Sequence, residues 1–160
     1  MVHLPTALSV IVLILVANAA PVAAKYGLGR TGGRAIDAGL RLGDRQPLFG
    51  PNKTWRGIVA ALFATSVASA LFGLPAGLGL AIAGSAIAGD LLSSFLKRRL
   101  GLESGADAPA LDLAAESLFP AILAKYGLGL SWLDVALIVA GFFLTHRLLA
   151  LLWRRLAGAG

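Results

Sequence analysis

Three polar side chains lie at helical spacing near the end of a long apolar stretch. Residues 57–96 contain one charged residue, Asp90, and Ser94 and Lys97 follow it four and seven positions later. Positions at this spacing share one face of a helix, so a carboxylate, a hydroxyl and an ammonium would project together. An acid inside a membrane helix is costly and marks a candidate functional site. The grouping suits a site for a metal ion and a phosphate, although a structural ion pair or an interfacial acid would also account for Asp90.

A second pair of acids, Asp112 and Glu116, stands four residues apart where another apolar segment begins. Like charges at this spacing repel on a simple helix, so a cation between them would explain the placement. Mg²⁺ prefers oxygen ligands and usually binds one or two carboxylates together with substrate phosphates. We therefore predict a metal site formed by Asp90, Asp112 and Glu116. The alternative is that the helix macrodipole favours two acids at a helix N-terminus.

The segment 50–57 reads Gly-Pro-Asn-Lys-Thr-Trp-Arg-Gly and stands at the start of the same long apolar stretch. Its Gly-Pro pair indicates a turn, and its tryptophan suits a bilayer interface. Its hydrogen-bond donors suit phosphate oxygens. These candidate donors are Asn52, Lys53, Thr54 and Arg56. An ordinary interfacial anchor is the alternative explanation for this segment, and a topology anchor is the alternative for the basic run at 97–99.

The composition places these residues in a membrane protein. Of the 160 residues, 58% are hydrophobic and 14% are charged, against about 25% charged in an ordinary soluble domain. The mean hydropathy is +0.81. These values argue against a soluble domain, a disordered chain and a nucleic-acid-binding module. The chain has no cysteine, which excludes disulfides, thiolate zinc sites and cysteine nucleophiles.

The predicted fold class is all-α, a polytopic transmembrane helical bundle that forms a single integral membrane domain over residues 1–160. About 20 apolar residues suffice to cross a bilayer, and residues 4–24 carry no charge. Residues 57–96 are too long for one span, and the Gly-Leu-Pro-Ala-Gly segment at 73–77 supplies a break. We expect the fourth span to be broken or half-buried around Pro120. The predicted spans are about five: 4–24, 57–75, 78–96, 113–131 and 132–153.

The basic residues predict the orientation of the bundle. The segment 25–56 holds seven of them, 97–112 holds three, and Arg154 and Arg155 lie near the C-terminus. All of these fall on one side if the N-terminus is outside and the C-terminus is cytoplasmic, so 25–56 and 97–112 are the predicted cytoplasmic loops. Lys125 and Asp134 are the exceptions. We predict a multi-pass protein of the cell membrane with a site that faces the cytoplasm.

The first span also resembles a secretory signal, because residues 20–24 read Ala-Pro-Val-Ala-Ala. Only His3 precedes its apolar run, whereas a secretory signal normally has a basic segment there. We therefore expect this helix to be retained.

Two motifs resemble those of the CDP-archaeol synthase family and its bacterial relatives. They are the segment 50–57 and the Gly-Asp-Leu-Leu-Ser-Ser-Phe-Leu-Lys-Arg-Arg segment at 89–99. The second also looks like the Ser-x-x-Lys-Arg motif of CDP-diacylglycerol synthases. The resemblance runs from about Asn18 to Ser117 and implies an integral membrane cytidylyltransferase. In such an enzyme a lipid phosphate attacks the α-phosphorus of CTP, with Mg²⁺ as cofactor, and gives a CDP-lipid and pyrophosphate.

The resemblance also implies roles for individual residues. Lys53 would contact phosphates, Lys97 and Arg98 would hold the CTP triphosphate, and the three acids would bind the metal. The predicted catalytic residues are Asp90, Lys53 and Lys97. The predicted residues for binding CTP and the lipid phosphate are Asn52, Lys53, Thr54, Arg56, Ser94, Lys97 and Arg98.

The expected partners are CTP, the bilayer, and an isoprenoid ether or diacyl glycerol phosphate, without nucleic acid. Residues 108–117 depart from the diacylglycerol-type pattern, because they contain no histidine and their second acid is a glutamate one residue later than the usual aspartate. Where the archaeal pattern has a glutamine after its first acid, this chain has Leu113.

Two other functions are consistent with the residues. One is another lipid-phosphate enzyme, such as a glycerol-phosphate acyltransferase-like protein, and the other is a small transporter subunit or scaffold. The chain has only two histidines, His3 and His146, and both are expected outside the site. Their absence from the site counts against enzymes with a histidine base, whereas a lipid phosphate is already an anion and can attack without one.

Overall fold

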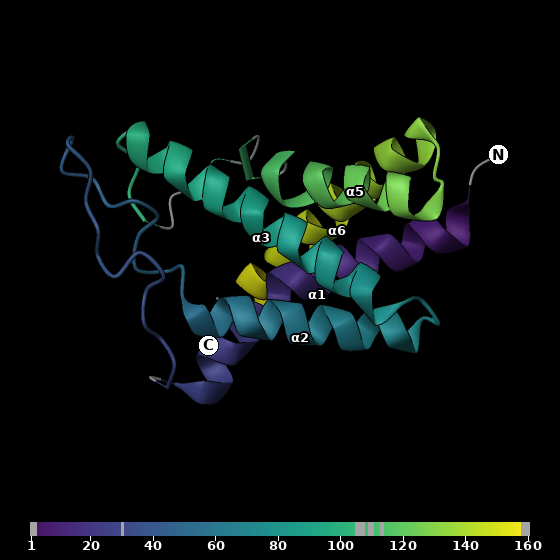
Figure 1. Ribbon diagram of the computed structural model, residues 1–160, viewed down its shortest axis with the longest axis horizontal. Coiled ribbons are helices and arrows are strands. Elements are labelled where there is room, and N and C mark those ends of the chain that lie inside the picture. The colour runs from purple at the N-terminus through teal and green to yellow at the C-terminus, as the bar shows by residue number, and fades with distance from the viewer. Residues whose placement is uncertain (1–2, 30, 105–107, 109–110, 113, 158–160) are drawn as a thin grey trace.

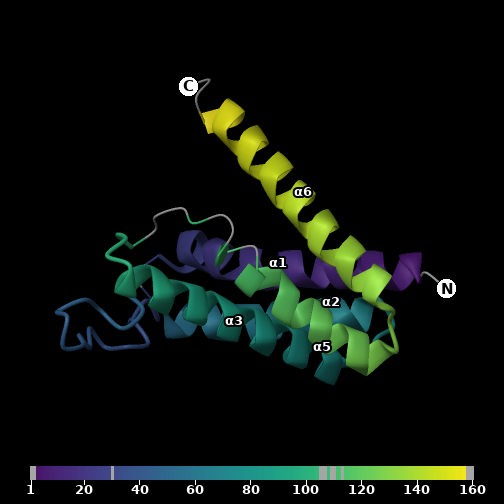
Figure 2. The ribbon, with the colours of Figure 1, turned by 90° about the horizontal axis from the view of Figure 1, so that it is seen from above.

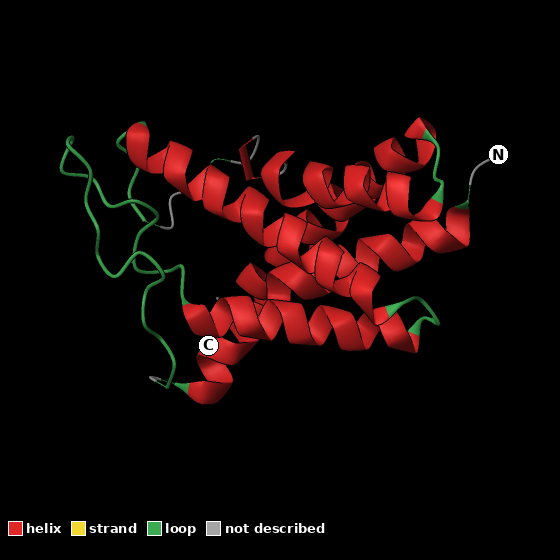
Figure 3. Ribbon diagram, viewed as in Figure 1, coloured by secondary structure: helices red, strands yellow, loops and turns green. Residues whose placement is uncertain are grey.

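The computed structural model describes residues 3–29, 31–104, 108, 111–112 and 114–157. Its helices are α1 (Leu4–Leu28), α2 (Trp55–Leu71), α3 (Ala76–Arg99), the π-helical turn η1 (Ala114–Leu118), α5 (Phe119–Leu128) and α6 (Trp132–Ala157) (Figure 1). Two isolated antiparallel bridges lie in the long loop between α1 and α2. Leu111 and Asp112 are also helical, and the rest of the described chain is turn and loop (Figure 3). The all-α prediction is confirmed for these residues.

The polar loops lie together at one end of the bundle. Figures 1 and 2 both show the loop between α1 and α2 beside the end of α3, and the α2–α3 and α5–α6 turns at the opposite end. At that opposite end, the backbone N–H of His3 donates to the Asp134 carboxylate at 2.9 Å and joins the start of α1 to α6. The described parts of the two predicted cytoplasmic loops therefore share one end, whereas Arg30 and residues 105–107 and 109–110 lie outside the described residues.

Among the described residues, three helices are long and apolar enough to cross a bilayer: α1, α3 and the Trp132–Leu149 part of α6. The helix α2 has 17 residues and ends at Leu71, earlier than the predicted end at 75. The reason is that the turn expected at 73–77 begins at Phe72, and α3 then begins at Ala76. The other two predicted spans, 57–75 and 113–131, correspond to α2 and to η1 with α5. These helices are too short to count as membrane spans by length and composition alone.

The fourth predicted span, 113–131, is not one regular helix. Glu116 lies in the π-helical turn η1, and α5 begins at Phe119 with Pro120 in its first turn. Proline has no N–H to donate to the carbonyl four residues earlier, which is that of Glu116. A wider π-helical turn accommodates this missing bond, and such turns are frequent at functional sites. The break expected around Pro120 is confirmed, while Leu113 lies outside the described residues.

The hydrophobic core lies where α1, α3, α5 and α6 meet. The helix α2 contributes small side chains to the interior, among them Ala61, Thr65 and Ser69, and turns large apolar ones such as Phe63 outward. An outward apolar face is what a lipid surrounding requires. The largest fully buried apolar side chains of the core are Val10, Leu13, Ile14, Ile82, Ile138 and Phe142.

Both charged residues that depart from the topology pattern have local partners. The ammonium of Lys125 lies 4.6 Å from the ring centroid of Tyr126 and 4.8 Å from that of Trp132. The buried carboxylate of Asp134 accepts hydrogen bonds from the backbone N–H of Ser131 at 2.9 Å and from its hydroxyl at 2.7 Å. The Asp134 N–H donates back to that hydroxyl at 3.2 Å, so the pair forms a capping box at the start of α6.

Two glycines of α3 permit close helix contacts. A Cβ atom built on Gly79 would lie 2.6 Å from the carbonyl oxygen of Thr65 in α2, and one built on Gly89 would overlap the carbonyl oxygen of Ala115 in η1. Gly84, on the same helix, has open space beside it. The small residues of α3 therefore bring η1, and with it Glu116, close to the helix that carries Asp90.

We expect Gly89→Ala to destabilise the protein by about 1–3 kcal/mol, because overpacking against backbone forces the helices apart. Gly84→Ala is the matched control on α3 and should leave stability unchanged or raise it slightly. Thermal unfolding of both variants in one detergent measures the difference. Equal transition temperatures for the two variants would contradict the close α3–η1 contact.

Candidate active site

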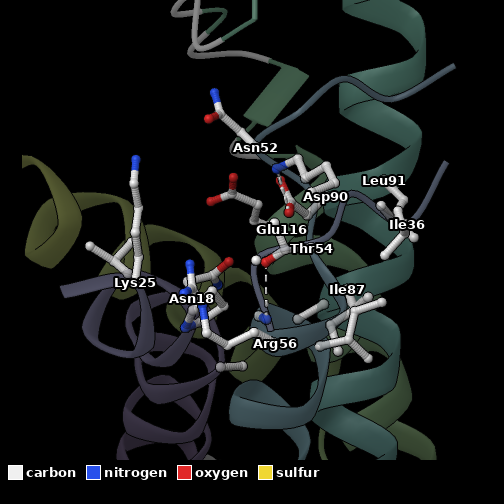
Figure 4. A pocket seen from close by; sticks show the side chains of 18 of the residues that line it. Asn18, Lys25, Ile36, Asn52, Thr54, Arg56, Ile87, Asp90, Leu91 and Glu116 are labelled. Carbon is white, nitrogen blue, oxygen red and sulfur yellow. Dashed lines mark hydrogen bonds and ion pairs between the residues drawn. The ribbon is translucent and has the colours of Figure 1, made fainter. Parts of the chain in front are cut away.

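A cavity of about 740 Å³ opens between α1, α2, α3 and the loop that precedes α2. Its walls include Lys53 from the loop, Asp90 from α3 and Glu116 from η1. Figure 4 shows Asn18 and Lys25 of α1 across the cavity from these groups. Cavities of this size commonly hold small-molecule ligands, and this one combines apolar helix walls with a few charged groups.

An ion pair between Lys53 and Asp90 lies on the cavity wall. The Lys53 ammonium donates to both carboxylate oxygens of Asp90, each at 2.6 Å. Both side chains are half-buried, at 24% and 31% exposure. A charge on a membrane helix is tolerated where it is paired and faces a cavity. The loop motif at 50–57 and the intramembrane acid, distant in sequence, therefore form one site.

A second ion pair joins α3 to the residues just before η1. The Lys97 ammonium donates to the Asp112 carboxylate at 2.8 Å, and the Ser93 hydroxyl donates to the same oxygen at 2.5 Å. Burial raises the pKa of Asp112, but the hydrogen bonds from Lys97 and Ser93, the lysine charge and the Ala108 N–H outweigh it. The net result is a pKa held below the usual value, so this carboxyl is ionised at neutral pH.

Glu116 connects the two pairs. It interacts electrostatically with Asp90 and Asp112 and with the two lysines, Lys53 and Lys97. Three carboxylates and two ammonium groups are thus gathered around the cavity end of α3. The sequence prediction placed these five groups in one site, and the structure brings them into one electrostatic cluster.

The residues present fit a divalent cation only with help from substrate. Within the described part of the chain, no three His, Cys, Asp or Glu side chains converge closely enough to hold a metal ion. Asp90 and Asp112 are each engaged by a lysine. The carboxylate oxygens nevertheless have the chemistry that Mg²⁺ prefers, and Mg²⁺ usually takes only one or two carboxylates besides phosphates. The donor set therefore suits a cation that arrives with a polyphosphate.

Three other predicted phosphate ligands lie on the cavity wall and also have structural partners. The Asn52 amide donates to the Ser104 hydroxyl at 3.1 Å. The Thr54 hydroxyl accepts from the backbone N–H of Gly57 at 3.2 Å and caps α2. Arg56 donates to the Thr31 carbonyl at 3.0 Å, and to the carbonyl of Gly29 as well, so it ties the end of α1 to the start of α2.

Four predicted site residues do not line the cavity: Ser94, Lys97, Arg98 and Asp112. Lys97 and Asp112 form the second ion pair. Ser94 and Arg98 are buried, and Arg98 donates to the carbonyl oxygen of Glu103 at 2.6 Å, closing the loop after α3. The Nε of Arg98 has no partner among the described residues. The hydroxyl that reaches the cluster is that of Ser93, which helical spacing from Asp90 did not select.

Sequence reasoning missed part of the site. His146 was expected outside it, but this residue of α6 lines the cavity, as does Asn18 of α1. The Asn18 amide donates to the Ile14 carbonyl at 2.9 Å within its own helix. A polar amide in an uncharged apolar span was a signal that could have pointed to Asn18. Nothing in the sequence indicated which face of α6 would meet the other helices, so the sequence could not place His146 at the cavity.

Comparisons with known proteins identify the family of this chain. Residues 35–105 match the profile of a cytidylyltransferase family, and residues 76–153 match that of CDP-archaeol synthase. The CDP-archaeol synthase of Hyperthermus butylicus is 40% identical over 127 residues, which cover 74% of this chain and 71% of that protein. That of Aeropyrum pernix is 40% identical over 134 residues, with 78% and 73% covered.

A solved structure is also similar, one described as an intramembrane enzyme for archaeal membrane lipids biosynthesis. The match has a TM-score of 0.78 and 33% sequence identity, and it covers 91% of this chain and 92% of that one. The helical fold and the site thus define an intramembrane, CTP-dependent nucleotidyltransferase that makes a CDP-activated lipid. The chain belongs to the CDP-archaeol synthase family. This result favours a cytidylyltransferase over an acyltransferase-like enzyme and over a transporter subunit or scaffold.

Asp90→Asn should lower turnover by about 100-fold or more, the scale seen when one group that stabilises transition-state charge is removed. The amide is nearly isosteric but uncharged, so it cannot neutralise Lys53 and would bind a cation more weakly. Glu103→Gln, at an exposed acid of the loop after α3, is the matched control and should retain activity. Rates per folded protein, with CTP and lipid phosphate saturating, provide the measurement. Unchanged turnover in Asp90→Asn would remove this residue from the site.

Proposed function

We propose that this enzyme transfers the cytidylyl group of CTP to an isoprenoid ether glycerol phosphate at the cavity described above. The observation that carries the proposal is the Lys53–Asp90 pair on the wall of a cavity enclosed by apolar helices. Such a cavity can take a triphosphate from water while the substrate's tail stays in the bilayer. The relatives' name, CDP-archaeol synthase, supports an ether lipid over a diacyl one.

The reaction needs little acid–base chemistry from the protein. An oxygen of the lipid phosphate forms a bond to the α-phosphorus of CTP, and the bond from that phosphorus to the α,β-bridging oxygen breaks. Pyrophosphate leaves with the bonding electron pair. Because the attacking oxygen is already anionic, no side chain has to remove a proton, and catalysis in such transfers is mainly positioning and charge neutralisation.

The two lysines provide much of that neutralisation in our proposal. The Lys53 ammonium pairs with Asp90 on the cavity wall, and the Lys97 ammonium pairs with Asp112 elsewhere in the charged cluster. Phosphate oxygens would share these ammonium groups, since each lysine has three N–H donors. Asn52 and Thr54 add neutral polar groups on the wall formed by the loop and the start of α2. Ser94 and Arg98 would act indirectly, through the packing of α3 and its following loop.

The cofactor in this proposal is Mg²⁺. Asp90, Asp112 and Glu116 are the residues that would hold it, and when bound it would supply positive charge to the phosphates of CTP. The five charged side chains carry two positive and three negative charges when all are ionised. The cation would offset part of the negative charge of the polyphosphate, and the ammonium groups of Lys53 and Lys97 would offset a further part.

We further propose that five helical segments cross the cell membrane, with the N-terminus outside and the cavity open to the cytoplasm. The clustering of the described basic loops at one end of the bundle supports this orientation, because cytoplasmic loops carry the excess of Lys and Arg. CTP is also a substrate that arrives from the cytoplasm.

Cysteine labelling tests the orientation, and a chain without native cysteine makes the test clean. Gly43→Cys, in the loop before α2, should react with a membrane-impermeant maleimide only after the cells are opened. Gly73→Cys, in the α2–α3 turn, should react in intact cells and serves as the matched control. The reversed pattern would overturn the orientation and place the cavity on the outer side.

The activity is tested with purified protein, labelled CTP and a panel of lipid phosphates. An isoprenoid diether glycerol phosphate should give a CDP-lipid, phosphatidic acid should give much less, and chelation of divalent cations should stop the reaction until Mg²⁺ is restored. Chromatography of the labelled lipid measures the product. Equal or better use of phosphatidic acid would overturn the ether-lipid assignment, and full activity in excess chelator would overturn the metal assignment.

A further inference from the structure

Asp37 is a buried acid in the loop between α1 and α2, and no step above uses it. Its side chain is among the few buried charged groups of the described chain, with 8% exposure for the residue. One carboxylate oxygen accepts from the backbone N–H of Gly39 at 3.0 Å. The other accepts from two backbone N–H groups, those of Phe49 at 3.0 Å and Gly50 at 2.9 Å. Asp37 therefore binds the backbone immediately before the turn that carries Lys53.

The residues beside Asp37 hold the other end of that turn. The Ile36 N–H donates to the Lys53 carbonyl at 2.9 Å, and the Trp55 N–H donates to the Arg34 carbonyl at 3.2 Å. Ala35 and Thr54 form an antiparallel bridge. The short segment 34–37 thus contacts the chain on both sides of residues 50–53, through Asp37 at the first end and Ile36 at the second.

The turn between these anchors is tight. Gly50 has a φ of 101°, a conformation that favours glycine. The Lys53 N–H donates to the Gly50 carbonyl at 3.2 Å. The backbone position of Gly50 therefore determines the backbone position of Lys53. Since the Lys53 ammonium lies 2.6 Å from each Asp90 oxygen, a small movement of the turn would break that contact.

We propose that Asp37 is a positioning residue for cytidylyl transfer, which fixes the turn at 50–53 so that the Lys53 ammonium meets Asp90 and the substrate phosphates. The catalytic role of Lys53 in this inference rests on the proposed function, whereas the position of its side chain rests on the hydrogen bonds described above. Backbone hydrogen bonds from Gly50, Phe49 and Gly39 outweigh the effect of burial and hold the pKa of Asp37 below its usual value. The carboxylate is therefore ionised, and each of its oxygens acts as an acceptor.

A purely structural role for Asp37 is the competing explanation, and Asp44 supplies the comparison. Asp44 lies in the same loop and accepts from the Gln46 N–H at 3.1 Å, which is also a turn contact two residues ahead. It is exposed and pairs with Arg99 at 2.9 Å, away from the turn at 50–53. Asp44→Asn therefore changes an acid of the same loop without touching the anchors of Lys53.

The first measurement reads the position of Lys53 without depending on activity. Purified protein is treated briefly with a small amine-acylating reagent, and mass spectrometry gives the modification of Lys53 relative to Lys25. In Asp37→Asn an amide N–H group would face backbone N–H donors, so the turn shifts and the Lys53–Asp90 pair opens. We expect Lys53 modification to rise several-fold over Lys25, and Asp44→Asn to match the parent protein.

The second measurement separates rate from binding. Asp37→Asn should lower kcat by on the order of 10- to 100-fold, as misplacement of a catalytic group does, with KM for the lipid phosphate changed little. Asp37→Glu keeps an ionised acceptor on a longer side chain and should recover part of both kcat and the protection of Lys53. It also keeps the test valid if Asp37→Asn does not fold.

The outcomes distinguish the two proposals. Normal Lys53 labelling in folded Asp37→Asn or Asp37→Glu overturns the positioning role. Equal rises at Lys53 and Lys25, with a lower unfolding temperature and no recovery in Asp37→Glu, also overturn it in favour of a general structural role. Selective exposure of Lys53 with a normal kcat supports the positioning by Asp37 and overturns the catalytic role of Lys53 instead.

Discussion

Lys53 and Asp90 are 37 positions apart in the chain, and their contact joins the polar loop before α2 to α3 of the apolar helix bundle. Neither charge would be stable alone in such surroundings, because an isolated ion loses its hydration there. The fold must therefore bring the two side chains into contact, and this requirement constrains the loop after α1 and the helices α2 and α3. The loop after α1 must fold back over the bundle, α2 must begin within the motif at 50–57, and α3 must pass beside the cavity. The geometry of the site and the arrangement of the helices therefore depend on each other.

Helix geometry explains why the three basic residues at the end of α3 do not form one cluster. Successive helical residues point about 100° apart, so Lys97, Arg98 and Arg99 leave the helix in three directions. Lys97 reaches Asp112, Arg98 reaches the Glu103 carbonyl, and Arg99 reaches the Pro47 carbonyl at 2.7 Å and Asp44 at 2.9 Å. The lysine pairs with a carboxylate of the charged cluster, while the two arginines bind the loops. Adjacent residues of one motif can thus have different roles: Lys97 belongs to the charged cluster, whereas Arg98 and Arg99 stabilise the neighbouring loops.

The sequence was sufficient for the helical class, for the break around Pro120 and for the charged groups of the site, because each leaves a local signal. An acid in an apolar run, such as Asp90, is costly wherever the chain folds, so its presence is informative by itself. Ser93 and His146 could not be predicted in this way, since their place depends on how α3 meets Asp112 and how α6 crosses α1. The predicted end of α2 at 75 was too late for a local reason: Gly73 has a φ of 70°, and the Leu74 N–H donates to the Ser69 carbonyl at 2.9 Å, which ends the helix.

Glu116 shows how a local irregularity can serve the site. Pro120 leaves the Glu116 carbonyl without its helical donor, and the π-helical turn that results lies against Gly89, where a side chain would collide with the backbone of Ala115. The absence of a side chain at Gly89 is therefore what admits η1 to the side of α3. Asp90 follows that glycine directly, so the point of closest helix approach is also the point where the carboxylates gather. Close packing and charge clustering have the same cause, and a change that separates α3 from η1 would weaken both together.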